Sequence, residues 1–226
     1  MSTSTERELP LFPLERVVLF PGMLLPLYIF EERYKVMIGS CQVTDQLFGV
    51  LLIHAGREVG APATPERVGC TARMVRLDRL PDGRMSLLAV GEHRFRLMGP
   101  ARVAPEGYLT GQVSITSQEP PAEGVRQELV GEVIAEFERY RAAMRPAGPA
   151  GAAGGGEGGS GGTGVEKLAG DPVRLSFVVG AGLAVAQLEL QFLLELDDVG
   201  TRLERELALL RRENRLAQQG APFSLN

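Results

Sequence analysis

The sequence predicts an α+β fold in which a curled or barrel-like β-sheet precedes a small bundle of helices. Apolar stretches broken by proline, then alternating apolar and polar residues between turns, fill the chain up to about residue 118. From Pro120 onwards the apolar residues recur at helical spacing instead. At 226 residues the chain has room for one large domain or two modest lobes. We therefore expect a β-rich lobe over residues 1–118 and a helical bundle over residues 119–226.

Residues 9–34 are the most apolar stretch of the chain, and prolines recur in it at short intervals. Each proline removes a backbone donor and fixes its own φ, which excludes a helix here. Phe20-Pro21-Gly22-Met23 predicts a type II turn, because proline presets the second turn position and glycine accepts the positive φ of the third. The segment from Leu24 to Phe30 that comes next is apolar at both alternating positions. Such a strand is either buried on both faces or has one face open to a partner.

Turn and cap residues divide the rest of the chain. Pro81-Asp82-Gly83-Arg84 predicts a hairpin between two strands of alternating residues, and Gly91 predicts a bulge or barrel corner in the return strand. Asp171 and Pro172 supply an N-cap and a first helical residue. The expected elements after the turn are a short helix within residues 31–44, strands over 46–54, 68–80, 85–90, 93–98 and 108–116, and helices over 123–145, 172–185, 187–196 and 198–218. In the first helix, Tyr34, Val36, Met37, Ile38 and Cys41 give an apolar face at i, i+3, i+4 and i+7 from Tyr34. The last helix carries Val199, Leu203, Leu207 and Leu210 on one side and Arg202 elsewhere.

Residues 146–164 contain ten glycines, and we expect them to form a flexible loop within the helical lobe. Ser160 lies in a literal match to the hydrolase nucleophile elbow, but that motif requires a strand-to-helix turn, and glycines continue here on both sides. The glycine spacing from Gly154 to Gly159 matches a dinucleotide-binding motif, but no strand precedes it and no helix begins at it, so we expect no nucleotide site there. Near Gly180 and Gly182 the small residues fit helix packing better than nucleotide binding.

Charge and cysteine content exclude several classes of partner. The net charge is −4, and residues 1–120 carry 13 basic and 13 acidic residues, which disfavours nucleic acid. The start of the chain shows no targeting segment and no apolar run is long enough to span a membrane, so we expect a cytoplasmic soluble protein. Cys41 and Cys70 are too few for a disulfide framework, or for a zinc site without His54 and His93. We expect both cysteines to be buried, with no metal and no cofactor.

No pattern of residues predicts catalysis. Arg94 and Arg96 alternate with apolar residues and could contact a ligand, although a solvated sheet face is the expected explanation. The pairs Glu31-Glu32 and Asp197-Asp198 are adjacent in sequence, so that their side chains diverge and cannot share a proton. A phosphate-binding Gly-x-x-x-x-Gly-Lys-Ser/Thr loop is missing from the sequence. We therefore expect no catalytic residues and no enzyme.

Several longer motifs resemble the N-terminal domain of Lon proteases. The resemblance begins with Leu-Pro-Leu-Phe-Pro-Leu and Val-Val-Leu-Phe-Pro-Gly-Met-Leu-Leu-Pro-Leu, and the ending Phe-Glu-Glu-Arg-Tyr is most similar to the stand-alone members of that family. Later segments occur in the expected order. The matching stretches are residues 9–14, 17–27, 29–34, 68–73, 79–84, 90–96 and 193–203.

This resemblance implies a PUA-like curled sheet followed by a small helix bundle, in a stand-alone member that lacks the ATPase and the Ser-Lys peptidase of the full protease. The chain has only two lysines, Lys35 and Lys167, which agrees with that expectation. By resemblance, the domain recognises exposed segments of substrate proteins. The glycine-rich insertion departs from the family pattern, and no function is carried over to it.

These observations leave three functional hypotheses. The first is a non-catalytic module that binds exposed apolar polypeptide segments through Met23, Leu24, Tyr28 and Phe30, with a role as adaptor for a separate ATP-dependent protease. The alternative for those four residues is that they fill the interface between the two lobes. The second hypothesis is RNA binding by the PUA-like sheet, which the zero net charge of the β lobe opposes. The third is an uncharacterised hydrolase, for which the sequence assembles no nucleophile, base and oxyanion site.

Overall fold

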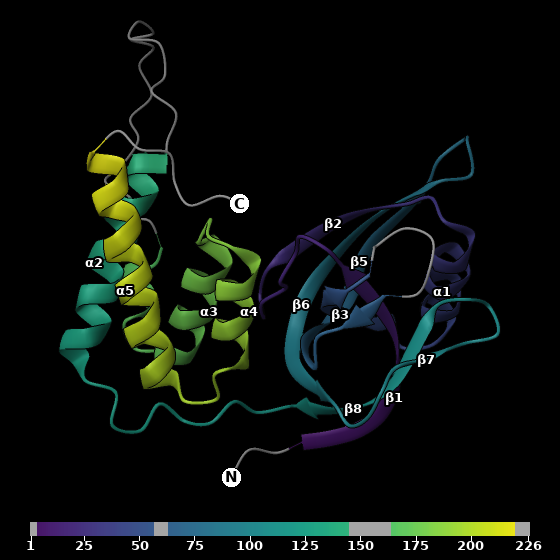
Figure 1. The fold of residues 1–226 in the computed structure, drawn as a ribbon, viewed down its shortest axis with the longest axis horizontal. Helices are drawn as coiled ribbons and strands as arrows, with labels where there is room; N and C mark the ends of the chain where they lie inside the picture. Colours follow the sequence, from purple (N-terminus) through teal and green to yellow (C-terminus); the bar gives the residue numbers. More distant parts are fainter. Residues whose placement is uncertain (1–3, 57–62, 145–163, 220–226) are drawn as a thin grey trace, which may run out of the picture. The chain divides into compact units, whose positions relative to one another are not determined.

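The computed structural model describes residues 4–56, 63–144 and 164–219, which divide into two compact units (Figure 1). The β unit comprises Met1–Pro120 and Gln187–Glu195, and the helical unit comprises Pro121–Ala186 and Leu196–Asn226. Except for Gly164, the glycine-rich loop expected over residues 146–164 lies outside the described residues.

One eight-stranded sheet forms the frame of the β unit. The order of its strands is β2-β6-β5-β3-β1-β8-β7, and β4 pairs with β3. Because β6 pairs with β8 as well as with β5, the strands β6, β5, β3, β1 and β8 close into a small barrel, as expected from the sequence. The strands are β1 (Ser4–Leu14), β2 (Leu24–Ile29), β3 (Leu47–Ala55), β4 (Thr64–Pro65), β5 (Val68–Arg79), β6 (Met85–Leu97), β7 (Arg102–Val103) and β8 (Leu109–Thr116).

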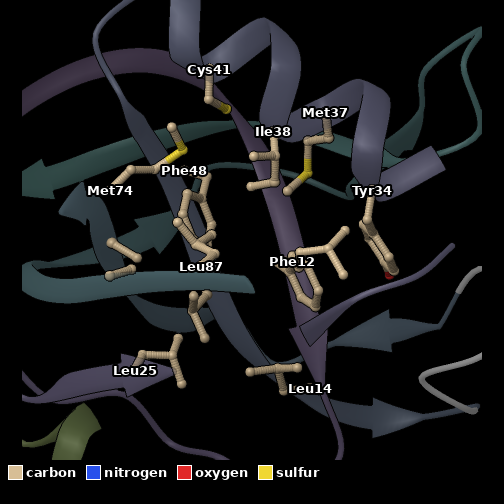
Figure 2. Close-up of a cluster of buried hydrophobic side chains, with 14 of the residues drawn as sticks. Phe12, Leu14, Leu25, Tyr34, Met37, Ile38, Cys41, Phe48, Met74 and Leu87 are labelled. Carbon is tan, nitrogen blue, oxygen red and sulfur yellow. The ribbon is translucent and has the colours of Figure 1, made fainter. Parts of the chain in front are cut away.

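Helix α1 (Glu32–Val43) packs its apolar face onto a core cluster of the β unit, which we call the first core cluster. Figure 2 shows the side chains of this face pointing towards Phe12 and Phe48 from the sheet. The rings of Phe12 and Tyr34 stack with their centroids 4.2 Å apart. The spacing in the sequence predicts this face correctly. Its buried residues are Tyr34, Met37, Ile38 and Cys41.

A second core cluster fills another part of the barrel. It contains residues from strands β1, β3, β6 and β8, and Ala101 packs against it partly buried. Its buried members are Leu9, Leu11, Leu47, Leu51, Phe95, Leu97, Leu109, Val113 and Ile115.

The hairpin between β5 and β6 has the predicted turn, with Gly83 at φ +79° and the amide of Leu80 donating to the carbonyl of Arg84 at 2.8 Å. Beside Gly91 the register shifts, so that two residues of β6 oppose Thr71 alone. This is the expected bulge. The strand nevertheless continues through it, which makes β6 one long strand where the sequence predicts two.

Arg94 is buried, with 3% of its surface exposed, so the expectation of a solvated side chain was wrong. Its guanidinium donates to the carboxylate of Glu119 at 2.8 and 2.7 Å, and to the carbonyl of Leu194 at 2.9 Å. Leu194 belongs to α4 (Gln187–Glu195), which the sequence assigns to the helical lobe but which packs in the β unit. The amide of Gln191 also holds α4, by donating to the carbonyl of Val68 at 3.0 Å.

The helical unit contains α2 (Gln127–Met144), the 3-10 turn η1 (Glu166–Leu168), α3 (Pro172–Gly182) and α5 (Val199–Gln218). Asp171 caps α3 as predicted, accepting from the amide of Arg174 at 3.0 Å. Near the end of α3, a side chain at Gly182 would come within 2.6 Å of the Phe137 ring, which explains the small residue there. None of the helices in the described ranges is long and apolar enough to cross a membrane.

Helix α5 buries charged residues among its apolar ones. Arg202 is fully buried, although the sequence pattern places it off the apolar side of the helix, and that expectation was wrong. Its guanidinium donates to the Ser176 hydroxyl at 2.9 Å and lies over the ring of Phe177. Glu206, one turn further on, is also fully buried, and neither of its carboxylate oxygens has a hydrogen-bond partner among the residues that the structure describes. Desolvation therefore raises the pKa of Glu206 well above its usual value, and the nearby charge of Arg202 opposes this only in part.

We expect Glu206→Gln to stabilise the protein more at about pH 8 than at about pH 5. The folded pKa of Glu206 lies above its unfolded value, so its contribution to the free energy of unfolding is fully present below the unfolded pKa of about 4.3 and is lost as the pH rises through the folded pKa. Between the unfolded and the folded pKa, the free energy of unfolding of the wild type falls by up to about 1.4 kcal/mol per pH unit relative to that of the variant. Urea unfolding at both pH values measures the difference.

Glu204→Gln removes the same charge from an exposed position of the same helix and serves as the control. A Glu206→Gln effect of the same size at both pH values would contradict the raised pKa.

Candidate functional site

The predicted type II turn fixes the start of β2. Gly22 has φ +82°, and the amide of Met23 donates to the carbonyl of Phe20 at 3.1 Å. The turn is bound to β6 by two backbone hydrogen bonds, from the amide of Gly22 to the carbonyl of Gly91 at 2.8 Å, and from the amide of Gly91 to the carbonyl of Met23 at 2.9 Å. A β-carbon at position 91 would lie 2.3 Å from the Phe20 carbonyl oxygen. Only glycine therefore permits this approach, which sets the register of β2 against β6.

Strand β2 has one buried and one exposed face, although both faces are apolar. Leu25 and Ile29 point into the first core cluster and are buried, and Leu27 packs against it partly buried. Leu24 and Tyr28 point the other way, with 59% and 48% of their surface exposed. The sequence left open which face is covered, and the structure shows that the odd-numbered residues are the covered ones.

The exposed side chains of β2 continue onto β6. The register pairs Leu24 with Val90, Pro26 with Leu88 and Tyr28 with Ser86. Val90 and Leu88 alternate with the buried Ala89 and Leu87, so they share the exposed side of the sheet with their partners on β2. We call the residues Leu24, Pro26, Tyr28, Leu88 and Val90 the outer β2 face.

Of the four residues proposed from the sequence, the structure brings three to the exposed side. Leu24 and Tyr28 lie on the outer β2 face, and Phe30, 52% exposed, follows at the next alternate position just past the strand. Met23 is partly buried and packs against the core cluster, away from the other three. Leu88 and Val90 were missed, although the alternation of apolar residues over 85–90 could have indicated them.

Charged residues border the outer β2 face. The guanidinium of Arg84 lies 4.8 Å from the centre of the Tyr28 ring and pairs with the carboxylate of Asp82 at 2.5 Å. Arg76 lies opposite Leu88 on β5 and pairs with Asp78 at 2.7 Å. An apolar centre with a polar rim is the usual anatomy of a protein interaction patch.

Groups suited to catalysis or metal binding are not assembled in the parts of the chain that the structure describes. There, no cluster of three or more His, Cys, Asp or Glu side chains could hold a metal ion. Both cysteines are buried, as expected, and desolvation raises the pKa of Cys41 to about 12 and that of Cys70 as well. A thiol with a raised pKa is a poor nucleophile, because only the thiolate is reactive. His54 is exposed and lies 2.9 Å from the carboxylate of Glu66.

Comparison with known proteins identifies the relatives of the chain. The protein-family model described as the ATP-dependent protease La (LON) substrate-binding domain matches residues 8–212 of the chain. Lon protease 2 of Desulfotalea psychrophila is 28% identical over 210 residues, which are 92% of this chain and 26% of that protein. The Lon protease of Roseiflexus castenholzii is 27% identical over 212 residues, covering 94% of this chain and 25% of that protein. The chain thus spans about a quarter of the length of these curated relatives.

Solved structures show the same fold. A Lon N-terminal domain protein from Xanthomonas campestris is similar with a TM-score of 0.65 and 29% identity, covering 89% of this chain and 98% of that one. The N-terminal domain of the Lon protease of the Mycobacterium avium complex is similar with a TM-score of 0.64 at 16% identity, covering 91% and 98%. The second likeness concerns the fold alone.

The position of the outer β2 face depends on Gly91, which mutation can test. We expect Gly91→Ala to lower the free energy of unfolding by about 2 kcal/mol or more, because the new methyl group would overlap the Phe20 carbonyl and force the turn away from β6. Urea unfolding measures the change.

Gly39→Ala is the matched control, because Gly39 lies within α1 and an added β-carbon meets no atom within 4 Å. There, alanine should raise the free energy of unfolding by about 0.5–1 kcal/mol through its helix propensity. Equal effects of the two substitutions would show that the turn does not need glycine at position 91.

Proposed function

Because the chain belongs to the ATP-dependent protease La (LON) substrate-binding domain family, we propose that it is a non-catalytic recognition module that binds exposed apolar polypeptide segments on its outer β2 face. The supporting observation is the row of apolar side chains that β2 turns to solvent, continued by Leu88 and Val90 of β6. Large apolar side chains that are exposed side by side mark interaction sites more often than single ones do.

Apolar burial is the interaction that this face offers. Covering a side chain of the size of leucine or phenylalanine contributes about 1.5–3 kcal/mol, and the cost of ordering the bound segment offsets part of this. A few such contacts favour weak and reversible binding with little dependence on the exact sequence. The guanidinium of Arg84 lies over the ring of Tyr28, and 48% of the surface of Tyr28 is still exposed.

Contact through side chains fits this face better than addition of another strand. Among the described residues, β2 pairs with β6 only and forms an edge of the sheet. The carbonyl of Met23 points to β6, so the alternation of the antiparallel ladder directs the backbone groups of Leu24, Pro26 and Tyr28 to the open edge. Pro26 has no N–H to offer there, and proline on an edge strand opposes pairing with a further strand.

The transfer of bound segments to an ATP-dependent protease is the second part of the proposal. It is supported only by the relatives, which are named Lon proteases and of which this chain spans about a quarter. In this role the module would act as an adaptor that recognises substrate, while the protease hydrolyses it.

A double substitution on the outer β2 face tests the proposal. Leu24→Asp with Tyr28→Asp should weaken the binding of a fluorescein-labelled unfolded polypeptide at least about tenfold, because two exposed apolar contacts are replaced by charges. Fluorescence anisotropy measures the dissociation constant. The control is Val43→Asp with Leu188→Asp, which introduces the same charges at two other exposed apolar positions and should change binding less than about twofold.

Unchanged binding by the Leu24 and Tyr28 double variant would refute the proposed site. The same titration with a labelled RNA, across a series of salt concentrations, tests the alternative hypothesis. RNA binding that weakens steeply with salt, together with no binding of the unfolded polypeptide, would reverse the order of the two functions.

A further inference from the structure

The β unit contains a pocket of about 540 Å³ that is separate in its residues from the outer β2 face. It lies among β4, the end of β6, β7 and the start of β8. Leu97 and Leu109, both members of the second core cluster, line it, together with Ala101, which packs against that cluster. Its size falls in the range of about 300–1,000 Å³ that is usual for ligand pockets. The pocket therefore offers an apolar surface that is continuous with the core.

Among the described residues, Arg67 is the only charged side chain that lines this pocket, and no carboxylate lines it. Arg67 is exposed, and its side chain has no hydrogen bond or ion pair with any residue in the described ranges. The neighbouring carboxylate, Glu66, instead accepts from His54 at 2.9 Å. An exposed guanidinium that has no partner among the described residues and lies beside an apolar surface is complementary to a carboxylate attached to an apolar group.

We propose that this pocket binds the carboxyl terminus of a polypeptide whose last residue is apolar. The guanidinium of Arg67 holds the terminal carboxylate, and the last side chain packs on Ala101 and Val103, the more accessible apolar residues of the lining, beside the buried Leu97 and Leu109. This inference rests on the proposed function, since it takes the ligand to be a polypeptide, and it adds a preference for chain ends to the recognition of internal apolar segments.

A polypeptide fits the surroundings of the pocket better than a small apolar acid does. Val103, which also lines the pocket, is 54% exposed, so the pocket opens to solvent beside β7. Among the described strands, β7 pairs with β8 only and leaves its other edge open. An extended chain that leaves the pocket would have this strand edge beside it, whereas a small acid would make no use of it.

The test compares two forms of one short labelled peptide that has polar residues ahead of a terminal leucine, made with a free carboxylate and with a carboxamide. Fluorescence anisotropy with the full chain should show the free acid binding about tenfold or more tightly than the amide, because only the acid makes a charge-assisted pair with Arg67. Arg67→Gln should reduce this ratio to less than about twofold. Equal affinity of acid and amide for the wild type would overturn the proposal.

Arg102→Gln is the matched control, because Arg102 is an exposed arginine on β7 that does not line this pocket, and the variant should keep the full ratio. Gly99→Leu is a second test. Gly99 lines the pocket and a β-carbon there meets no atom within 4 Å, so a leucine narrows the pocket and should weaken both peptides. An acid-to-amide ratio that Arg102→Gln abolishes and Arg67→Gln preserves would overturn the assignment to Arg67.

Competition with octanoate distinguishes a polypeptide terminus from a small apolar acid as the ligand of the pocket. Octanoate should fail to displace the labelled peptide at an equal concentration, and displacement as strong as that by the unlabelled peptide would overturn the assignment to a polypeptide.

The comparison of the acid and amide peptides is independent of the outer β2 face, because the acid-to-amide ratio should persist in the Leu24→Asp and Tyr28→Asp double variant. Equal affinity of the acid and the amide peptide for the wild type would refute only the proposed binding of chain ends in the pocket. Unchanged binding of unfolded polypeptide by the double variant would refute only the proposed function of the outer β2 face.

Discussion

The two backbone hydrogen bonds that join the Phe20–Met23 turn to Gly91 determine how β2 lies on the sheet. They fix the register of β2 against β6, and a shift by one residue would exchange the buried and exposed faces of the strand. With the observed register, Leu25 and Ile29 complete the first core cluster, and Leu24 and Tyr28 remain outside. The same two hydrogen bonds thus place one face of β2 in the core and the other, the candidate binding face, on the surface.

Local signals in the sequence predicted most of the elements that this contact joins. Proline and glycine at positions 21 and 22 predicted the turn, and the spacing of Tyr34, Met37, Ile38 and Cys41 predicted the buried face of α1. These predictions succeeded because turn dihedrals and helical periodicity depend on neighbouring residues only. Which face of β2 is covered could not be predicted, since both alternating sets of positions from Leu24 to Phe30 are apolar. The register comes from Gly91, which is distant from β2 in the sequence.

The predictions that failed concern polar side chains whose partners are distant in the chain. Arg94 alternates with apolar residues like a solvated side chain, but Glu119 and the carbonyl of Leu194 cover it. Arg202 was placed off the apolar side of α5, although Ser176 and Phe177 of α3 surround its guanidinium. Glu206 follows Leu203 and precedes Leu210 at helical spacing, so the pattern indicates its position on the buried face. The pattern does not indicate that its carboxylate has no hydrogen-bond partner in the described part of the chain.

Methyl resonances report the occupancy of the outer β2 face most directly. With leucine and valine methyl groups isotopically labelled, titration of an unfolded apolar polypeptide should shift the signals of Leu24, Leu88 and Val90, and leave those of the inward-facing Leu25 and Leu87 unchanged. Binding of the polypeptide without any change at Leu24, Leu88 and Val90 would contradict the account, because it would place the contact on another surface of the protein.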